Sequence, residues 1–218
     1  MSGHAPPPAR PRERVRVKVC GVTSVADAVA CADAGVDAVG VNLVPSSLRR
    51  VDESVAREIA RELGARVLVV AVVADLTVAA MRALVQSTAV GCLQLHGRES
   101  AEDVRALLPH AYKAVRVAGP DDVALAEAMP GEYVLVDAKI EGSLGGTGRT
   151  MDWGLVAGLA RRRKLVLAGG LSPQNVGAAI AAVGPFCVDV ASGVEAQGAP
   201  RVKDLARVRA FVEAVRGA

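Results

Sequence analysis

Short runs of branched aliphatic residues alternate with longer amphipathic stretches along most of the chain. From Val15 onward, each Val- and Leu-rich run is followed by a turn that carries Gly, Asp, Ser or Pro, and then by an Ala-rich segment with helical periodicity. This alternation is typical of repeated βα units. It predicts strands over residues 15–20, 38–43, 66–72, 92–95, 112–117, 133–137, 164–168 and 187–190.

The amphipathic stretches predict eight helices, several of which begin near Ser, Asp or Thr as helix caps require. They cover residues 25–34, 52–63, 78–87, 101–108, 121–129, 152–161, 173–183 and 203–215. Regular alternation forces parallel strands with right-handed crossovers, and eight units in about 200 residues fit a closed barrel. The predicted fold class is therefore α/β, a single (β/α)8 TIM barrel. A doubly wound open sheet is the alternative, but it more often has fewer strands.

Composition refines this picture. Of the 218 residues, 51% are hydrophobic but only 2% are aromatic, so the core is built from Val, Leu, Ile and Ala, which suit a buried parallel sheet. The length fits one domain. We expect the barrel domain over residues 15–218, after a disordered lead-in over residues 1–14 that is rich in Pro and Arg.

Charge and cysteine usage exclude several classes of function. The formal charge of +3 is too small to indicate nucleic-acid binding as the main activity. No apolar run is long enough to span a membrane, and the N-terminus lacks a signal-peptide pattern, so a cytoplasmic location is expected. The four cysteines have neither metal-site nor disulfide spacing. We therefore expect no metal site. A monomer or homodimer is the usual range for a barrel of this size.

Two glycine-bearing turns follow the seventh and eighth predicted strands. The first contains Gly169 and Gly170, and the second contains Ser192 and Gly193. Glycine lets backbone N–H groups approach an anion closely, and barrels commonly bind phosphate at this location. The two turns together predict a phosphate site; the alternative is that the glycines only make tight turns.

A third glycine cluster, residues 142–148, includes Gly146 and follows the sixth predicted strand. Its composition predicts a mobile loop that closes over the active site. The alternative is an ordinary surface loop.

Candidate acid–base groups end two of the predicted strands. Lys18 and Cys20 share one strand face, and an ammonium beside a thiol favours the thiolate, which is the effective base. Asp137 ends an apolar strand, where burial would keep a carboxyl group protonated and available as a general acid. The alternatives are a buried structural cysteine and a helix-capping aspartate.

Other polar residues predict substrate contacts. Arg49 and Arg50 follow the second strand and are suited to a substrate carboxylate, although ordinary solvated arginines have the same pattern. Gln94 and His96 share a strand face toward the pocket, and a structural histidine is the alternative there. Asp189 lies beside the second phosphate turn and is suited to sugar hydroxyls or to acid–base work.

Five motifs in register resemble phosphoribosylanthranilate isomerase, and the resemblance runs from Val15 to the C-terminus. They are KVCGVT at 18–23, QLHG at 94–97, GGTG at 145–148 with DW at 152–153, LAGGL at 167–171 and VDVASGVE at 188–195. The resemblance implies an Amadori rearrangement without cofactor or metal, in tryptophan biosynthesis. It converts N-(5′-phosphoribosyl)anthranilate to 1-(2-carboxyphenylamino)-1-deoxyribulose 5-phosphate.

The resemblance also implies residue roles. Cys20 matches the general base at ribose C2, and Asp137 matches the general acid at the furanose ring oxygen. Arg49 matches the arginine that holds the anthranilate carboxylate. The substrate-binding set that we predict comprises Lys18, Arg49, Gln94, His96, Gly146, Gly169, Gly170, Asp189, Ser192 and Gly193. Asn42, Leu48 and Ala191 depart from the family pattern, and Asn42 puts the shape of the anthranilate pocket in doubt.

Two rival interpretations stay open. Another phosphosugar barrel enzyme would share the phosphate turns, but an epimerase needs more metal-ligating histidines than this chain's three, and a synthase needs lysines where Cys20 and Asp137 stand. A catalytically silent barrel that serves as a binding module is the other rival. The intact pair of Cys20 and Asp137 speaks against it.

Overall fold

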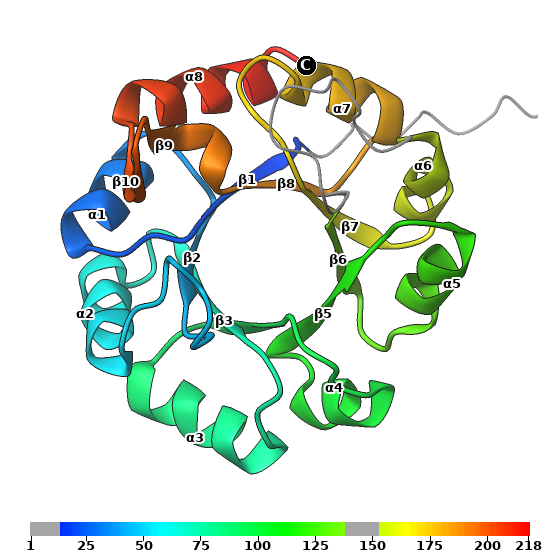
Figure 1. Ribbon diagram of the computed structural model, residues 1–218, viewed down its shortest axis with the longest axis horizontal. Helices are drawn as coiled ribbons and strands as arrows, with labels where there is room; N and C mark the ends of the chain where they lie inside the picture. Colours follow the sequence, from blue (N-terminus) through cyan, green and yellow to red (C-terminus); the bar gives the residue numbers. More distant parts are fainter. Residues whose placement is uncertain (1–13, 138–152) are drawn as a thin grey trace, which may run out of the picture.

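The computed structural model describes residues 14–137 and 153–218 of the chain. Eight parallel strands close into a barrel in sequence order, and a helix follows each strand on the outside (Figure 1). The predicted (β/α)8 barrel is thereby confirmed. The barrel strands are β1 (Arg16–Cys20), β2 (Ala38–Asn42), β3 (Leu68–Val73), β4 (Cys92–Leu95), β5 (Ala111–Arg116), β6 (Tyr133–Asp137), β7 (Lys164–Ala168) and β8 (Cys187–Val190).

The helices form the outer ring, and several of them begin where the sequence supplies a capping side chain. Ser24, Thr77 and Ser100 each accept a hydrogen bond from a backbone N–H in the first turn of the helix that follows. The helices are α1 (Val25–Asp33), α2 (Glu53–Leu63), α3 (Val78–Thr88), α4 (Ala101–Leu107), α5 (Pro120–Ala128), α6 (Gly154–Ala160), α7 (Val176–Val183) and α8 (Leu205–Arg216). Among the described residues, no helix is long and apolar enough to cross a bilayer.

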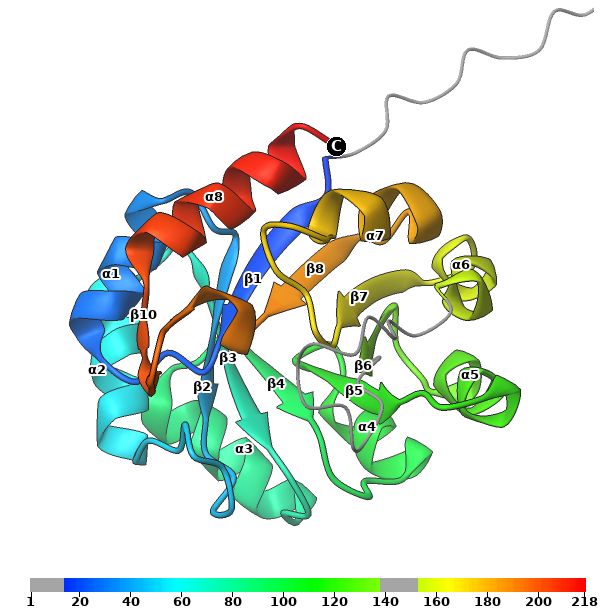
Figure 2. The ribbon, with the colours of Figure 1, turned by 45° about the horizontal axis from the view of Figure 1, so that its top comes forward.

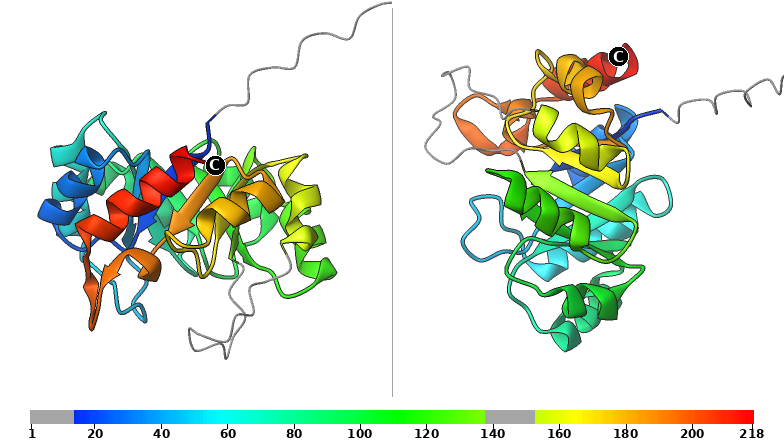
Figure 3. Two further views of the ribbon diagram at one scale, coloured as in Figure 1. Left: turned by 90° about the horizontal axis from the view of Figure 1, so that it is seen from above. Right: turned by 90° about the vertical axis from the view of Figure 1, so that its right-hand side faces the viewer.

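The chain between β8 and α8 differs from the prediction. A short 3-10 helix, η1 (Ser192–Val194), leads into an antiparallel hairpin of β9 (Glu195–Ala196) and β10 (Ala199–Lys203). The prediction that helix 203–215 begins at Lys203 is wrong, because Lys203 still pairs in the hairpin and Asp204 caps α8. The hairpin projects at the end of the barrel where the strands finish (Figure 3).

Helix α7 also begins later than predicted, at Val176 instead of residue 173. Asn175 explains the delay, because its side chain bonds back to the preceding turn. Its carbonyl oxygen accepts from the Ser172 N–H at 2.8 Å, and its amide nitrogen donates to the Gly170 carbonyl at 2.9 Å. The residues before α7 therefore order the glycine turn after β7.

The inside of the barrel changes from apolar to polar toward the ends of its strands. Val70, Tyr112, Leu135 and Val166 belong to an apolar cluster of buried strand residues. Closer to the strand ends, the ammonium of Lys18 lies between polar side chains. This layering is typical of TIM barrels and leaves the candidate acid–base groups at the C-terminal rim. Figure 2 shows the strands side by side inside the ring of helices.

Candidate active site

A cavity of about 280 Å³ opens at the C-terminal ends of the strands. Most of the predicted site residues line it together, namely Cys20, Arg49, Gln94, His96, Asp137, Gly169, Gly170, Asp189 and Ser192. Lys18 and Gly193 lie outside its lining. Gly146 and the rest of the 142–148 cluster lie outside the described residues, as do residues 1–13 of the lead-in. The structure therefore gathers residues from six of the eight barrel units at one place.

Cys20 fits into the rim because the neighbouring strand has a glycine opposite it. Cys20 on β1 pairs in register with Gly40 on β2. A Cβ atom at Gly40 would lie 2.8 Å from the Cys20 sulfur and 3.1 Å from the Lys18 ammonium. A side chain at residue 40 would therefore displace both groups. Nothing in the local sequence around Gly40 predicts this role.

Burial controls the protonation of Cys20. Removal from water raises the pKa of its thiol above the usual value, and the positive charges of Lys18 and Lys203 oppose that rise only in part. We expected Lys18 to lower the pKa of Cys20; its effect has that sign but is smaller than the effect of burial. In the unliganded cavity, Cys20 is therefore a thiol at neutral pH.

Lys18, Asp189 and Gln94 form a buried polar network next to the cavity. The Lys18 ammonium, with 3% of its side chain exposed, lies 2.8 Å from Asp189 Oδ2 and 3.0 Å from Gln94 Oε1. Among the residues that the structure describes, Asp189 Oδ1 is the one buried side-chain oxygen or nitrogen without a hydrogen-bond partner. Buried oxygens rarely stay unpaired, so Asp189 is an acceptor ready for a ligand hydroxyl.

His96 faces the predicted acid across the rim. Its Nε2 lies 4.0 Å from Asp137 Oδ2, and both side chains are about four-fifths buried, with 23% and 22% exposed. Burial lowers the pKa of His96 below its usual value, although Asp137 in its ionised form acts in the opposite direction. His96 is therefore neutral at neutral pH and cannot form a lasting ion pair with Asp137.

Arg49 is held in place by a buried carboxylate from the far end of the chain. Its Nε and Nη2 lie 2.5 Å and 2.7 Å from the two oxygens of Glu195, which also lies 3.2 Å from the Lys203 ammonium. The aliphatic part of Arg49 lies against Gly21, where φ is +72° and a Cβ atom would overlap the Arg49 side chain. The sequence did not reveal Glu195 and Lys203 as partners of Arg49.

The loop that carries His96 rests on a second buried ion pair. Lys113 and Glu99 lie 3.2 Å apart with 7% and 2% of their side chains exposed. The Glu99 carboxylate accepts from the N–H groups of Gly97 and Asp75, and Lys113 donates to the Gly97 carbonyl. These bonds fix the chain directly after His96, which gives the imidazole a stable position.

The two predicted phosphate turns lie side by side. Gly169 and Gly170 have φ of +97° and +65°, so the chain turns sharply after β7 in a conformation that favours glycine. Gly193 in η1 approaches the carbonyl of Leu171, and a Cβ atom there would overlap that oxygen. Gly193 therefore lets the turn after β8 pack closely against the turn after β7.

Replacing Gly193 with alanine is expected to separate the two turns. The added methyl group would overlap the backbone carbonyl of Leu171, and a shift of the backbone costs more than a shift of a flexible side chain. We expect about 1–3 kcal/mol of lost stability, as for other overpacked sites, together with weaker binding of inorganic phosphate. Thermal unfolding and phosphate titration measure both. Gly119→Ala is the control, because Gly119 has open space around its Cβ position and an extended φ of −159° that alanine also adopts. Unchanged stability and phosphate affinity in Gly193→Ala would contradict this role.

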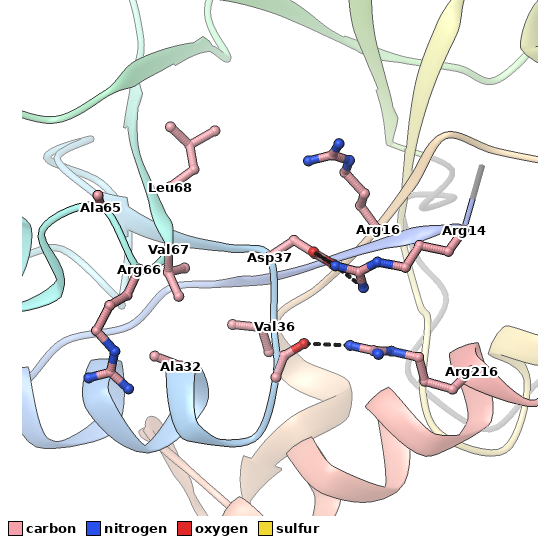
Figure 4. A pocket seen from close by; sticks show the side chains of 11 residues that line it. Arg14, Arg16, Ala32, Val36, Asp37, Ala65, Arg66, Val67, Leu68 and Arg216 are labelled. Atoms are coloured by element: carbon pink, nitrogen blue, oxygen red, sulfur yellow. Dashed lines mark hydrogen bonds and ion pairs between the residues drawn. The ribbon is translucent and has the colours of Figure 1, made fainter.

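A larger hollow of about 510 Å³ lies at the opposite end of the barrel, near the starts of β1, β2 and β3 (Figure 4). It is basic, but contacts within the protein engage its arginines. Arg14 pairs with Asp37 at 2.5 Å, and Arg216 donates to the Gly35 carbonyl at 2.9 Å. None of the predicted site residues lines this hollow, so we place the active site at the C-terminal rim.

Comparison with known sequences identifies relatives along nearly the whole chain. A family model described as N-(5′phosphoribosyl)anthranilate (PRA) isomerase matches residues 17–214. The N-(5′-phosphoribosyl)anthranilate isomerase of Pseudomonas aeruginosa strain LESB58 is 45% identical over 204 residues, which cover 93% of this chain and 95% of the relative.

Solved structures agree with the sequence comparison. The phosphoribosylanthranilate isomerase of Thermotoga maritima superposes with a TM-score of 0.83 at 36% identity, over 94% of this chain and all of the other. A phosphoribosylanthranilate isomerase in complex with reduced 1-(o-carboxyphenylamino)-1-deoxyribulose 5-phosphate gives 0.80 at 34% identity, with the same coverage. The similarity thus extends across all eight barrel units.

Proposed function

The chain belongs to the N-(5′-phosphoribosyl)anthranilate isomerase family, and we propose that Cys20 and Asp137 carry out the two proton transfers of its reaction. The enzyme is an isomerase of tryptophan biosynthesis. It converts N-(5′-phosphoribosyl)anthranilate to 1-(2-carboxyphenylamino)-1-deoxyribulose 5-phosphate by an Amadori rearrangement under general acid–base catalysis.

The observation that carries this assignment is that both groups line one cavity from separate strands. Cys20 ends β1 and Asp137 ends β6, and β7 and β8 lie between these strands in the closed sheet. A ribose bound between them presents its ring oxygen to one group and its C2 hydrogen to the other. The two transfers need an acid and a base at different atoms of one sugar, and this arrangement supplies them.

Asp137 acts first in the proposed sequence. Its protonated carboxyl group gives a proton to the furanose ring oxygen as the bond from that oxygen to C1 breaks. The nitrogen lone pair of the anthranilate forms a double bond with C1, which gives an open-chain cationic Schiff base and a new hydroxyl at C4. Asp137 is left as a carboxylate, which can accept a proton later in the cycle.

Cys20 acts second. The thiol loses its proton to solvent as the positive Schiff base forms. The thiolate then removes the proton from C2, and the released electron pair forms a C1–C2 double bond as the nitrogen becomes neutral. The resulting enolamine gains a proton at C1 and loses the one on the C2 hydroxyl, which yields the ketone product. The raised pKa of Cys20 fits this order, because the positive Schiff base lowers that pKa when the base is needed.

The remaining lining residues bind the parts of the substrate that do not react. The turns at Gly169–Gly170 and Ser192 are suited to the phosphate, and Asp189 Oδ1 is suited to a ribose hydroxyl. Arg49 donates two hydrogen bonds to Glu195, one from Nε and one from Nη2. Its other N–H groups stay available to the anthranilate carboxylate.

Arg49→Ala is expected to raise KM by about 10- to 100-fold with a smaller change in kcat, because a hydrogen bond to a charged group contributes about 1.5–3 kcal/mol. Glu195 keeps Lys203 as a partner, so the fold is expected to survive. Steady-state kinetics measure the effect. Arg50→Ala is the matched control, since Arg50 is half exposed and pairs with Asp52. If only Arg50→Ala raises KM, the carboxylate contact belongs to Arg50.

Growth of a bacterial strain that lacks this isomerase tests the function as a whole. Expression of the wild-type chain is expected to restore growth without tryptophan, and expression of Cys20→Ser is not. A folded wild-type protein that fails to restore growth would favour the catalytically silent barrel instead.

A further inference from the structure

The orientation of the Gln94 side chain is set by two donors inside the barrel. Gln94 Oε1 lies 3.0 Å from the Lys18 ammonium and 3.0 Å from the Tyr112 hydroxyl. An ammonium can only donate, and burial raises the pKa of Tyr112 so that its hydroxyl keeps its proton. The amide oxygen must therefore face Lys18 and Tyr112, and the amide nitrogen must face the other way.

This orientation determines which nitrogen of His96 carries the proton. Gln94 Nε2 lies 3.0 Å from His96 Nδ1, and an amide nitrogen can only donate. His96 Nδ1 must accept and is therefore unprotonated. The proton of the neutral imidazole then resides on Nε2, the atom that lies 4.0 Å from Asp137 Oδ2.

We propose that Gln94 is a positioning residue for the acid step, because it holds His96 as the neutral Nε2–H tautomer facing Asp137. The proposal rests on the proposed role of Asp137 as the general acid. Lys18 acts through the same chain of hydrogen bonds. This gives a buried lysine outside the cavity lining an indirect part in the chemistry.

The protonation state of His96 matters for Asp137. An imidazolium would hold Asp137 as a carboxylate, which has no proton to give to the ring oxygen. A neutral Nε2–H group leaves the proton on Asp137, and it presents an N–H, 4.0 Å from Asp137 Oδ2, toward the carboxylate that forms as the ring opens. Gln94 opposes a second proton on His96, because an Nδ1–H group would point at the N–H of the amide.

Charged groups on three strands also act on His96. Asp137 on β6 and Asp189 on β8 favour its charged form, whereas Arg116 and Lys113 on β5 disfavour it. Burial acts in the same direction as the two cations and has the largest effect. These charges do not distinguish the two ring nitrogens of His96. Gln94 does, because its amide N–H points at Nδ1.

Gln94→Glu tests the proposal most sharply, because the side chain keeps its size and a carboxylate replaces the donor opposite Nδ1. Lys18 still partners the new charge. The expected result is a protonated Nδ1, as the other tautomer or as imidazolium. The acidic limb of the kcat profile is expected to move to higher pH and kcat to fall by about tenfold or more, since one pKa unit is a tenfold change in population. KM changes less.

Nuclear magnetic resonance of protein with ¹⁵N-labelled histidine reads the tautomer directly. The chain has only three histidines, His4, His96 and His110, and a His96→Gln variant identifies the signals of His96. The wild type is expected to carry its proton on Nε2 at neutral pH. Tyr112→Phe is the matched control, because it removes one donor to Oε1 while Lys18 still fixes the amide.

Two results would overturn the proposal: a wild-type His96 with its proton on Nδ1, or a Gln94→Glu variant whose His96 tautomer and kcat profile match the wild type. If Gln94→Glu does not fold, the wild-type and Tyr112→Phe spectra still decide, because a tautomer change in Tyr112→Phe contradicts control by Lys18. The tautomer does not depend on turnover. An inactive wild type with Nε2–H would therefore count against the proposed function alone.

Discussion

Replacing Cys20 with serine is expected to lower kcat by a factor of about 10² to 10⁴, the usual contribution of a placed general base. Serine has nearly the same size as cysteine, but its hydroxyl is a far weaker base than a thiolate. The thermal unfolding temperature should change little, because Gly40 leaves the same space beside either side chain. Steady-state turnover and circular dichroism measure the two effects.

Cys92→Ser is the control for the Cys20 prediction. Cys92 begins β4, outside the cavity lining, and its thiol donates to the carbonyl of Leu93. Serine is similar in size to cysteine, and residue 92 does not line the cavity, so we expect kcat to stay within a few-fold of wild type. A Cys20→Ser enzyme with a kcat similar to that of Cys92→Ser would remove Cys20 from the role of base.

Replacing Asp137 with asparagine is expected to lower kcat by a similar factor, about 10² to 10⁴. An amide of the same shape cannot protonate the ring oxygen, so the furanose stays closed. Affinity for an open-chain, reduced analogue of the product is expected to remain, because that compound does not require ring opening. Turnover and equilibrium binding of this analogue therefore separate the chemical step from binding.

Asp33→Asn is the control for the Asp137 prediction. Asp33 ends α1 and pairs with Arg66 at 2.5 Å, with 59% of its side chain exposed. We expect normal turnover from this variant. If Asp137→Asn keeps its turnover but loses the analogue, Asp137 binds the substrate and another group supplies the proton.

The fold was predictable because each βα unit has a hydrophobic pattern that can be recognised from its own short stretch of sequence. Strands such as β6 and β7 appear in the sequence as isolated aliphatic runs, and the structure gives them the predicted bounds. The hairpin after β8 was missed for a physical reason. Its first strand, Glu195–Ala196, has only two residues, and alternation cannot be detected over so short a segment.

The clustering of the candidate site residues was predictable where they end strands, since parallel strands bring these ends together. Contacts between distant residues were not predictable. Arg49 and Glu195 are 146 positions apart, and Lys18 and Asp189 are 171 positions apart. The spacing of residues along a single sequence does not indicate which distant residues form such pairs. The net pKa direction of Cys20 was also out of reach, because it depends on how deeply β1 buries the thiol.

The central claim is that Cys20 and Asp137 perform the two proton transfers of one isomerisation. The most direct test is fluorescence-monitored turnover of freshly generated phosphoribosylanthranilate by the wild type, Cys20→Ser and Asp137→Asn in parallel. The account predicts rapid turnover by the wild type and its loss by about 10²-fold or more in each variant. Wild-type turnover that either variant retains would contradict the assignment of that residue, and absence of turnover in the folded wild type would contradict the activity itself.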